Sequence, residues 1–142
     1  MIGMGKLIMR RTVQMRFLVI GTFALLLSAI PSVAQAPELE MLTKLDKGLW
    51  ELRNRNNGDR QRICLRTGRE LIQLHHQQPG CSRFVVQDDA NEVTVQYTCH
   101  GSGFGRTTIR REGSSLVQIR SQGMASGTPF SLEGEARHQG KC

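Results

Sequence analysis

The sequence lacks an apolar stretch long enough to cross a membrane, and it has few aromatic residues. Its longest apolar run, from Phe17 to Ile30, has 14 residues, whereas a transmembrane helix needs about 20. We therefore expect no membrane span once the N-terminal segment is removed. Trp, Tyr and Phe make up only 5% of the chain. Because few large side chains are available to fill a core, we expect covalent cross-links to support the fold.

Short motifs that define metal, nucleotide or hydrolase sites are also missing. Successive cysteines are separated by 16, 17 and 42 residues, which excludes the close Cys-x-x-Cys pairs of zinc sites. The run His100–Gly105 is rich in glycine, but a strand-like stretch follows it where a phosphate loop would begin a helix. Ser102 in this run lacks the flanking glycines of a nucleophile elbow. We find no catalytic triad, and we predict no cofactor and no metal.

The four histidines do not form a recognisable site. His75 and His76 are adjacent, so on a helix they point about 100° apart and cannot hold one metal as an i, i+4 pair would. We predict that these two lie on a partly exposed polar helix face. His100 and His138 have no acidic or cysteine partner at a diagnostic spacing, and we predict that they are surface residues.

The N-terminus has the order of a secretory signal peptide, in which basic residues, an apolar run and small residues follow one another. Four basic side chains precede the apolar run, and small residues end it at Ala34. We predict a signal peptide at residues 1–34, cleaved after Ala34 and exported by general secretion. Cleavage after Ala36 is the alternative, although Pro37 would then follow the cut and hinder the peptidase. No cysteine lies near the cut, which excludes a lipid anchor there.

Removal of this segment changes the charge of the protein. The whole chain carries +7, but four of its 19 basic residues and none of its 12 acidic residues lie in residues 1–34, which leaves +3. This modest excess argues against nucleic acid as a partner. The remaining 108 residues suffice for one domain. We divide them into an N-terminal lead-in, residues 35–44, and a cysteine-bearing β-rich domain, residues 45–142.

After the lead-in, short runs of alternating apolar and polar residues are separated by turn residues, which is typical of antiparallel sheet. We predict a mainly β fold, a single antiparallel sheet of about seven short strands with one helix. The helix is predicted over Thr67–Gln78, where Thr67 and Glu70 fit a capping box. An even number of cysteines in an oxidising compartment indicates two disulfides. The cysteines are Cys64, Cys81, Cys99 and Cys142.

The dipeptide Asn57-Gly58 predicts a β-hairpin with a two-residue type I′ turn. Such a turn places Trp50 opposite Leu65 on an apolar face. The other face then carries four arginines in two opposed pairs, Arg53 with Arg62 and Arg55 with Arg60.

Because like charges opposite one another repel, this arginine face needs compensation. One interpretation is that Glu51, Glu133 or Glu135 neutralises it. The other is that it binds an anionic ligand or an acidic protein, since guanidinium groups hold carboxylates and phosphates well.

A second hairpin bears on the pairing of the cysteines. If Phe84 and Val86 share the core face with Tyr97, then Cys99 points inward and Cys81 points outward. This arrangement favours the pairs Cys64–Cys81 and Cys99–Cys142, although the other pairings stay open.

Several short sequences together suggest a family. They are the opening Gly48-Leu49-Trp50-Glu51, an Arg-x-Cys-Leu step at residues 62–65, Tyr97-Thr98-Cys99, and Arg-x-x-Gly-x-Cys at the C-terminus. This combination resembles the exported Gram-negative family called domain of unknown function 3617, over nearly all of residues 45–142. The resemblance implies a periplasmic, disulfide-bonded, β-rich domain, and it brings no known ligand or catalytic residue.

A weaker resemblance is to the periplasmic inhibitors of c-type lysozyme, small β-barrels with a Tyr-x-Cys strand and a Ser-Gly loop. Tyr97-Thr98-Cys99 and Ser126-Gly127 occur here in a similar order. The Gly-Leu-Trp-Glu opening and the predicted helix do not belong to that pattern.

We therefore expect a non-catalytic binding or envelope-associated module in the periplasm, with an anionic ligand or an acidic protein as its partner. Inhibition of lysozyme and an undetected hydrolase are the alternatives. A polar pocket that contains His100 or His138 beside an acidic or hydroxyl group would favour the hydrolase.

Overall fold

The computed structural model describes residues 38–142. The predicted signal peptide, residues 1–34, lies outside the described residues, as does the start of the lead-in. The described elements are, in order, α1 (Glu40–Thr43), β1 (Gly48–Asn54), β2 (Arg60–Leu65), the 3₁₀ turn η1 (Arg69–Leu71), β3 (Ser82–Asp88), β4 (Glu92–Cys99), β5 (Gly103–Gly113), β6 (Leu116–Ala125) and β7 (Thr128–Gly140). The predicted mainly β class is confirmed.

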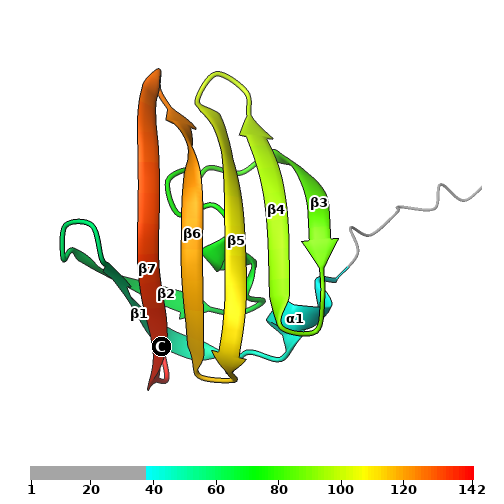
Figure 1. The fold of residues 1–142 in the computed structure, drawn as a ribbon, viewed down its shortest axis with the longest axis vertical. Helices are drawn as coiled ribbons and strands as arrows, with labels where there is room; N and C mark the ends of the chain where they lie inside the picture. Colours follow the sequence, from blue (N-terminus) through cyan, green and yellow to red (C-terminus); the bar gives the residue numbers. More distant parts are fainter. Residues whose placement is uncertain (1–37) are drawn as a thin grey trace, which may run out of the picture. The chain divides into compact units, whose positions relative to one another are not determined.

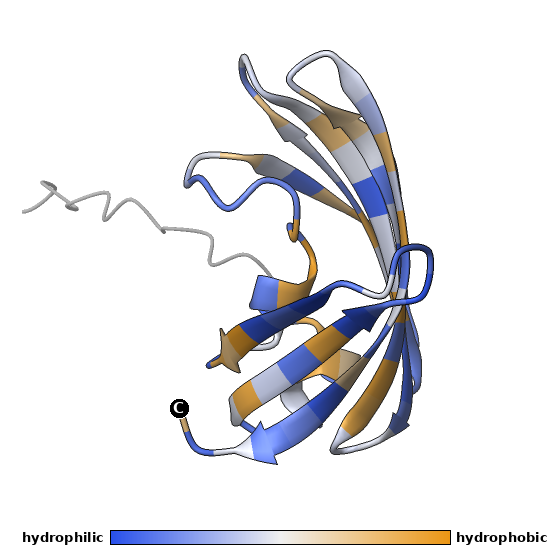
Figure 2. Ribbon diagram, turned by 90° about the vertical axis from the view of Figure 1, so that its left-hand side faces the viewer, coloured by the Kyte–Doolittle hydropathy of each residue, from blue (hydrophilic) through white to orange (hydrophobic). Residues whose placement is uncertain are grey.

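All seven strands form one open antiparallel sheet, in the order β2-β1-β7-β6-β5-β4-β3 (Figure 1). Strands β3 to β7 follow one another as a meander, and β1 then joins the free side of β7. Figure 2 shows that the sheet curls strongly, with the β1–β2 hairpin in one part of the curve and β3 in another. β2 and β3 are thus the two edge strands of the sheet.

The longest hairpin is built by a tight turn at Ser126-Gly127. Both residues have positive φ, 48° and 81°, and Ala125 pairs directly with Thr128. A two-residue loop with positive φ at both positions matches the right-handed twist of the flanking strands. The tight turn lets β7 extend over 13 residues.

The hydrophobic core lies on the concave side of the sheet, under α1 and the segment of residues 66–81. Trp50 and Tyr97 are its largest fully buried side chains, and the Trp50 indole N–H donates to the carbonyl of Asp46 at 2.8 Å. Met41 and Leu42, in the described part of the lead-in, are also buried. They cover the open side of a sheet that would otherwise expose its apolar face.

The first hairpin forms as predicted, but its register differs by two residues. Trp50 faces Ile63, and the connecting loop spans residues 55–58 instead of two residues. The side chains of Asn54 and Asn57 accept hydrogen bonds from the backbone N–H groups two residues further on, at 2.9 and 3.0 Å. These side-chain bonds stabilise the longer loop.

A shift of two residues leaves every side chain on its predicted face, because side chains alternate along a strand. The opposed pairs do change. Arg53 now faces Arg60, and Glu51 faces Arg62. Arg55 lies in the loop, outside β1.

The helix predicted over Thr67–Gln78 is wrong, since only the single 3₁₀ turn η1 forms. The Glu70 carboxylate does accept the backbone N–H of Thr67 at 3.3 Å, but the N-cap residue of η1 is Gly68, so the predicted capping box does not form. Residues 71–74, however, are all buried. A helix rotates successive side chains by about 100°, so it cannot turn four consecutive side chains towards one core. An irregular segment can do so.

The prediction that Phe84 and Val86 face the core is also wrong. Phe84 is 69% exposed and Val86 is 41% exposed. Arg83 instead pairs with Tyr97, so the inward positions of β3 are Arg83 and Val85. Three consecutive apolar residues occupy this strand, and alternation alone does not say which of them are buried.

The disulfides are Cys64–Cys142 and Cys81–Cys99, and no cysteine is free. Two disulfides are as predicted, but the favoured pairing is wrong. The pairing of Ser82 with Thr98, continued by one residue, brings Cys81 opposite Cys99, with a Cα–Cα distance of 4.3 Å. The predicted pairing is wrong because it assumes that Phe84 and Val86 face the core, which puts the Cys81 sulfur on the outer face of the sheet.

Candidate functional site: an arginine-lined cleft

A cleft of about 580 Å³ opens between edge strand β2 and the segment of residues 67–79, and β3 contributes one residue to it. The cleft lies where the two ends of the curled sheet approach the covering segment. Most of the residues that line it are polar. It contains three arginines, four glutamines and one acidic residue: Arg62, Arg69, Arg83, Gln61, Gln73, Gln77, Gln78 and Glu70.

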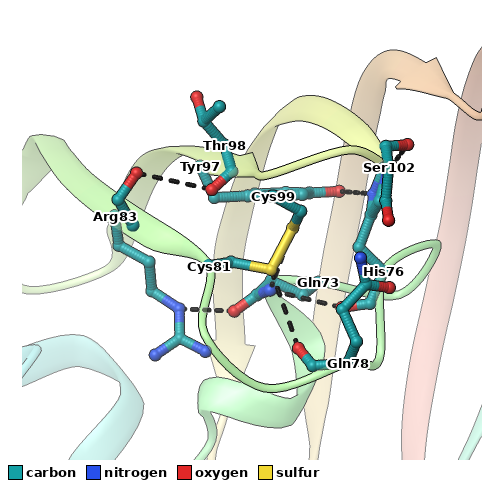
Figure 3. Close-up of a disulfide and its surroundings, with 10 residues drawn as sticks. Gln73, His76, Gln78, Cys81, Arg83, Tyr97, Thr98, Cys99 and Ser102 are labelled. Carbon is teal, nitrogen blue, oxygen red and sulfur yellow. Dashed lines mark hydrogen bonds between the residues drawn. A yellow bond between two sulfur atoms is a disulfide. The ribbon is translucent and has the colours of Figure 1, made fainter.

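The three arginines come from three different elements. Arg62 lies on β2, Arg69 in η1 and Arg83 on β3. Arg83 Nε donates to Gln73 Oε1 at 2.5 Å, and its two terminal nitrogens point away from Gln73 and the nearby disulfide (Figure 3). Partial burial, and then repulsion from the Arg69 guanidinium, lower the pKa of Arg83 below its usual value. The Arg69 guanidinium therefore lies close enough to Arg83 to act on its charge.

Glu70, the one carboxylate of the lining, is already engaged by other hydrogen-bond donors. Glu70 accepts hydrogen bonds from the backbone N–H groups of Arg66 and Thr67, at 3.2 and 3.3 Å, and from the Thr67 hydroxyl. These contacts hold the carboxylate at the start of the segment, just before η1. The lining residues thus include three arginines and one carboxylate that is already engaged.

The side chain of Gln73 fixes the segment of residues 67–79, which forms one wall of the cleft. This side chain is only 7% exposed; its amide nitrogen donates to the carbonyl of His76 at 3.2 Å and contacts Cys99 Sγ at 3.8 Å. Its amide oxygen receives the Arg83 bond. The segment also lies between two cross-linked residues, Cys64 and Cys81. The arginines of the cleft are therefore presented on a pre-organised frame.

His76 is buried, with 2% of its surface exposed, so the predicted exposed position is wrong for this residue. Its Nε2 lies 3.1 Å from the carbonyl oxygen of Ser102, which can only accept, so Nε2 carries the proton. Nδ1 then accepts a hydrogen bond from the Tyr97 hydroxyl at 3.2 Å (Figure 3). Burial raises the pKa of Tyr97, which keeps this hydroxyl protonated as a donor.

The predicted arginine face lies on the convex side of the sheet, where carboxylates stand among the arginines. Arg60 pairs with Glu51 at 3.2 Å. Arg55 donates to the side-chain oxygen of Gln118 at 2.6 Å and lies 3.6 Å from Glu135. The compensation by Glu51 and Glu135 considered from the sequence is therefore present in the geometry.

The other two arginines of that set differ in their surroundings. Arg53 stands between Arg60 on one side and Glu135 on the other. Arg62 faces Glu51 across the β1–β2 pair and also lines the cleft. Only one of the four predicted anion-binding arginines thus contributes to the cleft, and anion binding by the whole set stays a prediction.

Glu135 is the most engaged carboxylate of the convex face. Hydrogen bonds from Gln118 (3.1 Å) and Arg137 (2.6 Å) lower the pKa of Glu135 below its usual value, in that order of effect. Arg55 adds a smaller contribution of the same sign. A carboxylate held in this way is a poor candidate for proton transfer near neutral pH.

The remaining histidines are not part of the cleft. His75 is exposed but packs its ring on Phe130, with centroids 4.1 Å apart, and this partial desolvation, followed by repulsion from His76, lowers the pKa of His75. His138 lies with its Nε2 3.3 Å from the carbonyl of Lys47, and His100 is exposed. Neither His100 nor His138 lines the cleft.

Reasoning from the sequence missed Arg69 and Arg83. A signal for Arg83 existed, since it lies two residues from Cys81 and from Val85 and therefore shares their face. The prediction that Phe84 and Val86 face the core puts Arg83 on the outer face of the sheet instead. For Arg69 the predicted helix gave no reason to expect proximity to β3.

Within residues 38–142, no three His, Cys, Asp or Glu side chains gather closely enough to hold a metal ion. No helix in that part of the chain is long and apolar enough to cross a membrane. No family model matches the chain, and no curated protein matches it. The resemblance to domain of unknown function 3617 stays a prediction.

Proposed function

We propose that this protein is a periplasmic, non-catalytic binding module that takes an anionic ligand into the cleft between β2 and residues 67–79. The observation that carries the proposal is the excess of arginines among the lining residues, three against one engaged carboxylate. Arginine is the side chain best suited to bind carboxylate or phosphate through paired hydrogen bonds. A bound anion would also relieve the repulsion between Arg69 and Arg83.

The chemistry of the lining favours binding over catalysis. An arginine stays protonated near neutral pH and does not serve as a general acid or base. His76 is the lining residue suited to proton transfer, but both of its ring nitrogens are engaged, with Tyr97 and with the Ser102 carbonyl. Cys64 is tied in a disulfide and is not available as a nucleophile.

Export is supported by two features of different kinds. The N-terminal sequence has the order of a signal peptide, and both disulfides of the domain are of the sort that persists in oxidising compartments. The resemblance to an exported Gram-negative family points to the periplasm as that compartment.

A second candidate function is inhibition of c-type lysozyme. It is favoured by the position of Ser126-Gly127, which forms an exposed turn between β6 and β7. The variant Ser126→Asn should keep the turn, because Asn-Gly suits the same geometry. Under this candidate, the wild-type protein inhibits lysozyme and the variant does not.

The proposed anion site is tested by titration calorimetry with citrate and with inorganic pyrophosphate. The protein is the full chain, expressed with its own N-terminal segment and purified from the periplasm. We expect binding that weakens with salt, because screening acts on the charges involved. The double variant Arg62→Gln/Arg83→Gln should weaken both ligands by about tenfold or more, since charged hydrogen bonds are lost.

The matched control is Arg106→Gln/Arg120→Gln, which removes the same charge from the convex face. It should leave both affinities within about twofold, because only the general field changes. The single variant Arg62→Gln removes an exposed side chain and covers the case in which the double variant is unstable. Equal losses in the cleft and control variants would contradict the proposal, as would no binding of either anion.

A further inference from the structure

The edge of β2 is open to an additional strand. Residues 60–65 pair with β1, and within residues 38–142 their backbone makes no other backbone–backbone hydrogen bond. An edge strand of this kind presents a row of unpaired N–H and C=O groups on which an extended peptide can build. In β2 this edge borders the cleft, since Gln61 and Ile63 belong to its lining.

The opposite edge of the sheet differs. In β3 the pairing register shifts between Val85 and Gln87, and such a bulge twists an edge and blunts further pairing. β2 keeps a regular register through six consecutive pairs, from Leu65 to Arg60, and contains no proline. Of the two edges, β2 is therefore the one that retains the geometry required of a template.

The charges around β2 define which strand can add to it. Arg60 and Arg62 project to the convex side, and Arg69 and Arg83 belong to the neighbouring elements of the cleft region. A second copy of β2 would bring arginines against arginines, which is unfavourable across strands. An acidic strand would bring carboxylates against them instead.

Apolar residues refine this description of the partner. Ile63 and Leu74 line the cleft beside the arginines. In an added strand, side chains alternate between the two sides, with about 7 Å between residues on the same side. A segment of alternating acidic and apolar residues would therefore place carboxylates beside Arg60 and Arg62 and apolar side chains against Ile63.

We infer that β2 binds an extended acidic peptide segment as an eighth strand of the sheet, with the cleft receiving the side chains that point inward. This inference goes beyond the proposed function, because the carboxylates of the peptide lie beside Arg60 and Arg62 on the convex side, while the cleft receives its apolar side chains. Main-chain hydrogen bonds supply the affinity in this recognition mode, and the pockets and charges beside the edge supply the specificity.

The probe is a capped six-residue peptide of alternating Glu and Val, with a Lys-Val peptide as the charge control. Two further Glu-Val peptides carry N-methyl groups on alternate amides, one on the odd and one on the even positions. Alternate N–H groups of a strand point to the same side, so only one of the two methylated peptides loses the donors that face β2. We expect that peptide to lose at least about tenfold in affinity and the other to bind nearly as well as the parent.

Hydrogen exchange measured by NMR locates the added strand. Amides within Gln61–Cys64 should exchange several-fold more slowly with the Glu-Val peptide bound, while amides of β4, inside the sheet, should not change. Arg60→Gln/Arg62→Gln should weaken the peptide, and Arg106→Gln/Arg120→Gln should not.

Several outcomes overturn the inference. They are equal binding of both methylated peptides and the parent, tighter binding of the Lys-Val peptide, and unchanged exchange in β2. If citrate still binds in a manner that depends on Arg62 and Arg83, the anion site survives and only the peptide is excluded. If citrate and the Glu-Val peptide both fail to bind, the proposed function falls as well.

Discussion

The cleft and the convex face of the sheet both contain several arginines, but the groups that surround these arginines differ between the two regions. On the convex face, Glu51 contacts Arg60 at 3.2 Å and Glu135 contacts Arg137 at 2.6 Å, so positive charge is compensated within the sheet. In the cleft, the Arg83 side chain is held by the neutral Gln73 amide, and burial followed by the nearby Arg69 charge lowers the pKa of Arg83. The number of arginines therefore does not identify an anion site, whereas the groups placed beside them distinguish one region from the other.

The two regions also differ in how they are held together. The convex side chains are mostly exposed, and exposed ion pairs contribute about 0–1 kcal/mol each. The wall of the cleft is fixed by buried contacts of Gln73 and His76 and by a disulfide at each end. Three experiments test this contrast between a rigid cleft and a compensated surface.

The largest effect is expected from the disulfides. Loss of Cys64–Cys142, with a sequence separation of 78, should lower the free energy of unfolding by about 4.5 kcal/mol, and loss of Cys81–Cys99, with a separation of 18, by about 3 kcal/mol. The loss is larger for Cys64–Cys142 because the unfolded chain gains more conformational freedom when a longer loop is released. Urea unfolding of the two Cys-to-Ser double variants measures both values.

Thiol titration of the denatured, unreduced protein accompanies this measurement and should detect no free sulfhydryl. A peptide map that links Cys64 to Cys81 would contradict the structure. Loss of the Cys81–Cys99 disulfide should also weaken anion binding, because the segment that forms the wall of the cleft is then no longer fixed at that end. Weaker binding in this variant would distinguish the cleft from the convex face.

An intermediate effect is expected from Gly105→Ala. A Cβ at this position would lie 2.4 Å from the Tyr97 hydroxyl oxygen, so the ring must move and its hydrogen bond with His76 must be disturbed. We expect a loss of about 1–3 kcal/mol in stability, as in other overpacked sites. Thermal and urea unfolding measure it.

Gly113→Ala is the matched control, since a Cβ there meets nothing within 4 Å. It should change the stability by less than about 0.5 kcal/mol. A similar cost for both variants would show that the Tyr97–His76 contact does not support the cleft wall.

The smallest effect concerns the pH dependence of the convex face. Because the pKa of Glu135 is lowered by folding, the unfolded chain binds its proton more tightly than the folded protein does. The stabilisation is therefore present above the unfolded value, near 4.5, and is lost as the pH falls through the folded value. Urea midpoints between pH 7 and pH 3 should show this loss.

In Glu135→Gln the decline below pH 5 should be shallower, because the group that takes up the proton is gone. Glu133→Gln on the same strand leaves the Glu135 contacts in place and serves as the control. An equally steep decline in Glu135→Gln and in the wild type would contradict this role of Glu135. Binding in the cleft should not change in either variant.

Much of the fold was predictable from local patterns. Trp50 and Leu65 were expected on the apolar face of the first hairpin, and both are buried. The two-residue error in register did not matter for this assignment, because a shift by an even number preserves the faces. It did matter for the arginine pairs, since each arginine received a different partner across the strands.

Where local patterns were ambiguous, predictions failed. Phe84, Val85 and Val86 are all apolar, so alternation could not say which face of β3 was buried. The wrong choice then led to the wrong disulfides and concealed Arg83. Similarly, the contact of Glu70 with the Thr67 backbone forms, but a local start signal does not oblige the chain to continue as a helix when four consecutive residues must be buried.

The sequence by itself determined the mainly β class, the existence of seven strands, the faces of the first hairpin and the presence of two disulfides. Each of these depends on interactions between near neighbours or on a simple count. Only the tertiary structure decided which cysteines pair and which arginines meet. Arg62, Arg69 and Arg83 lie on three elements, and their proximity arises because the sheet curls and its two edges approach one covering segment (Figure 2). Curvature is the sum of many small twists along the whole sheet, so no short stretch of sequence contains it.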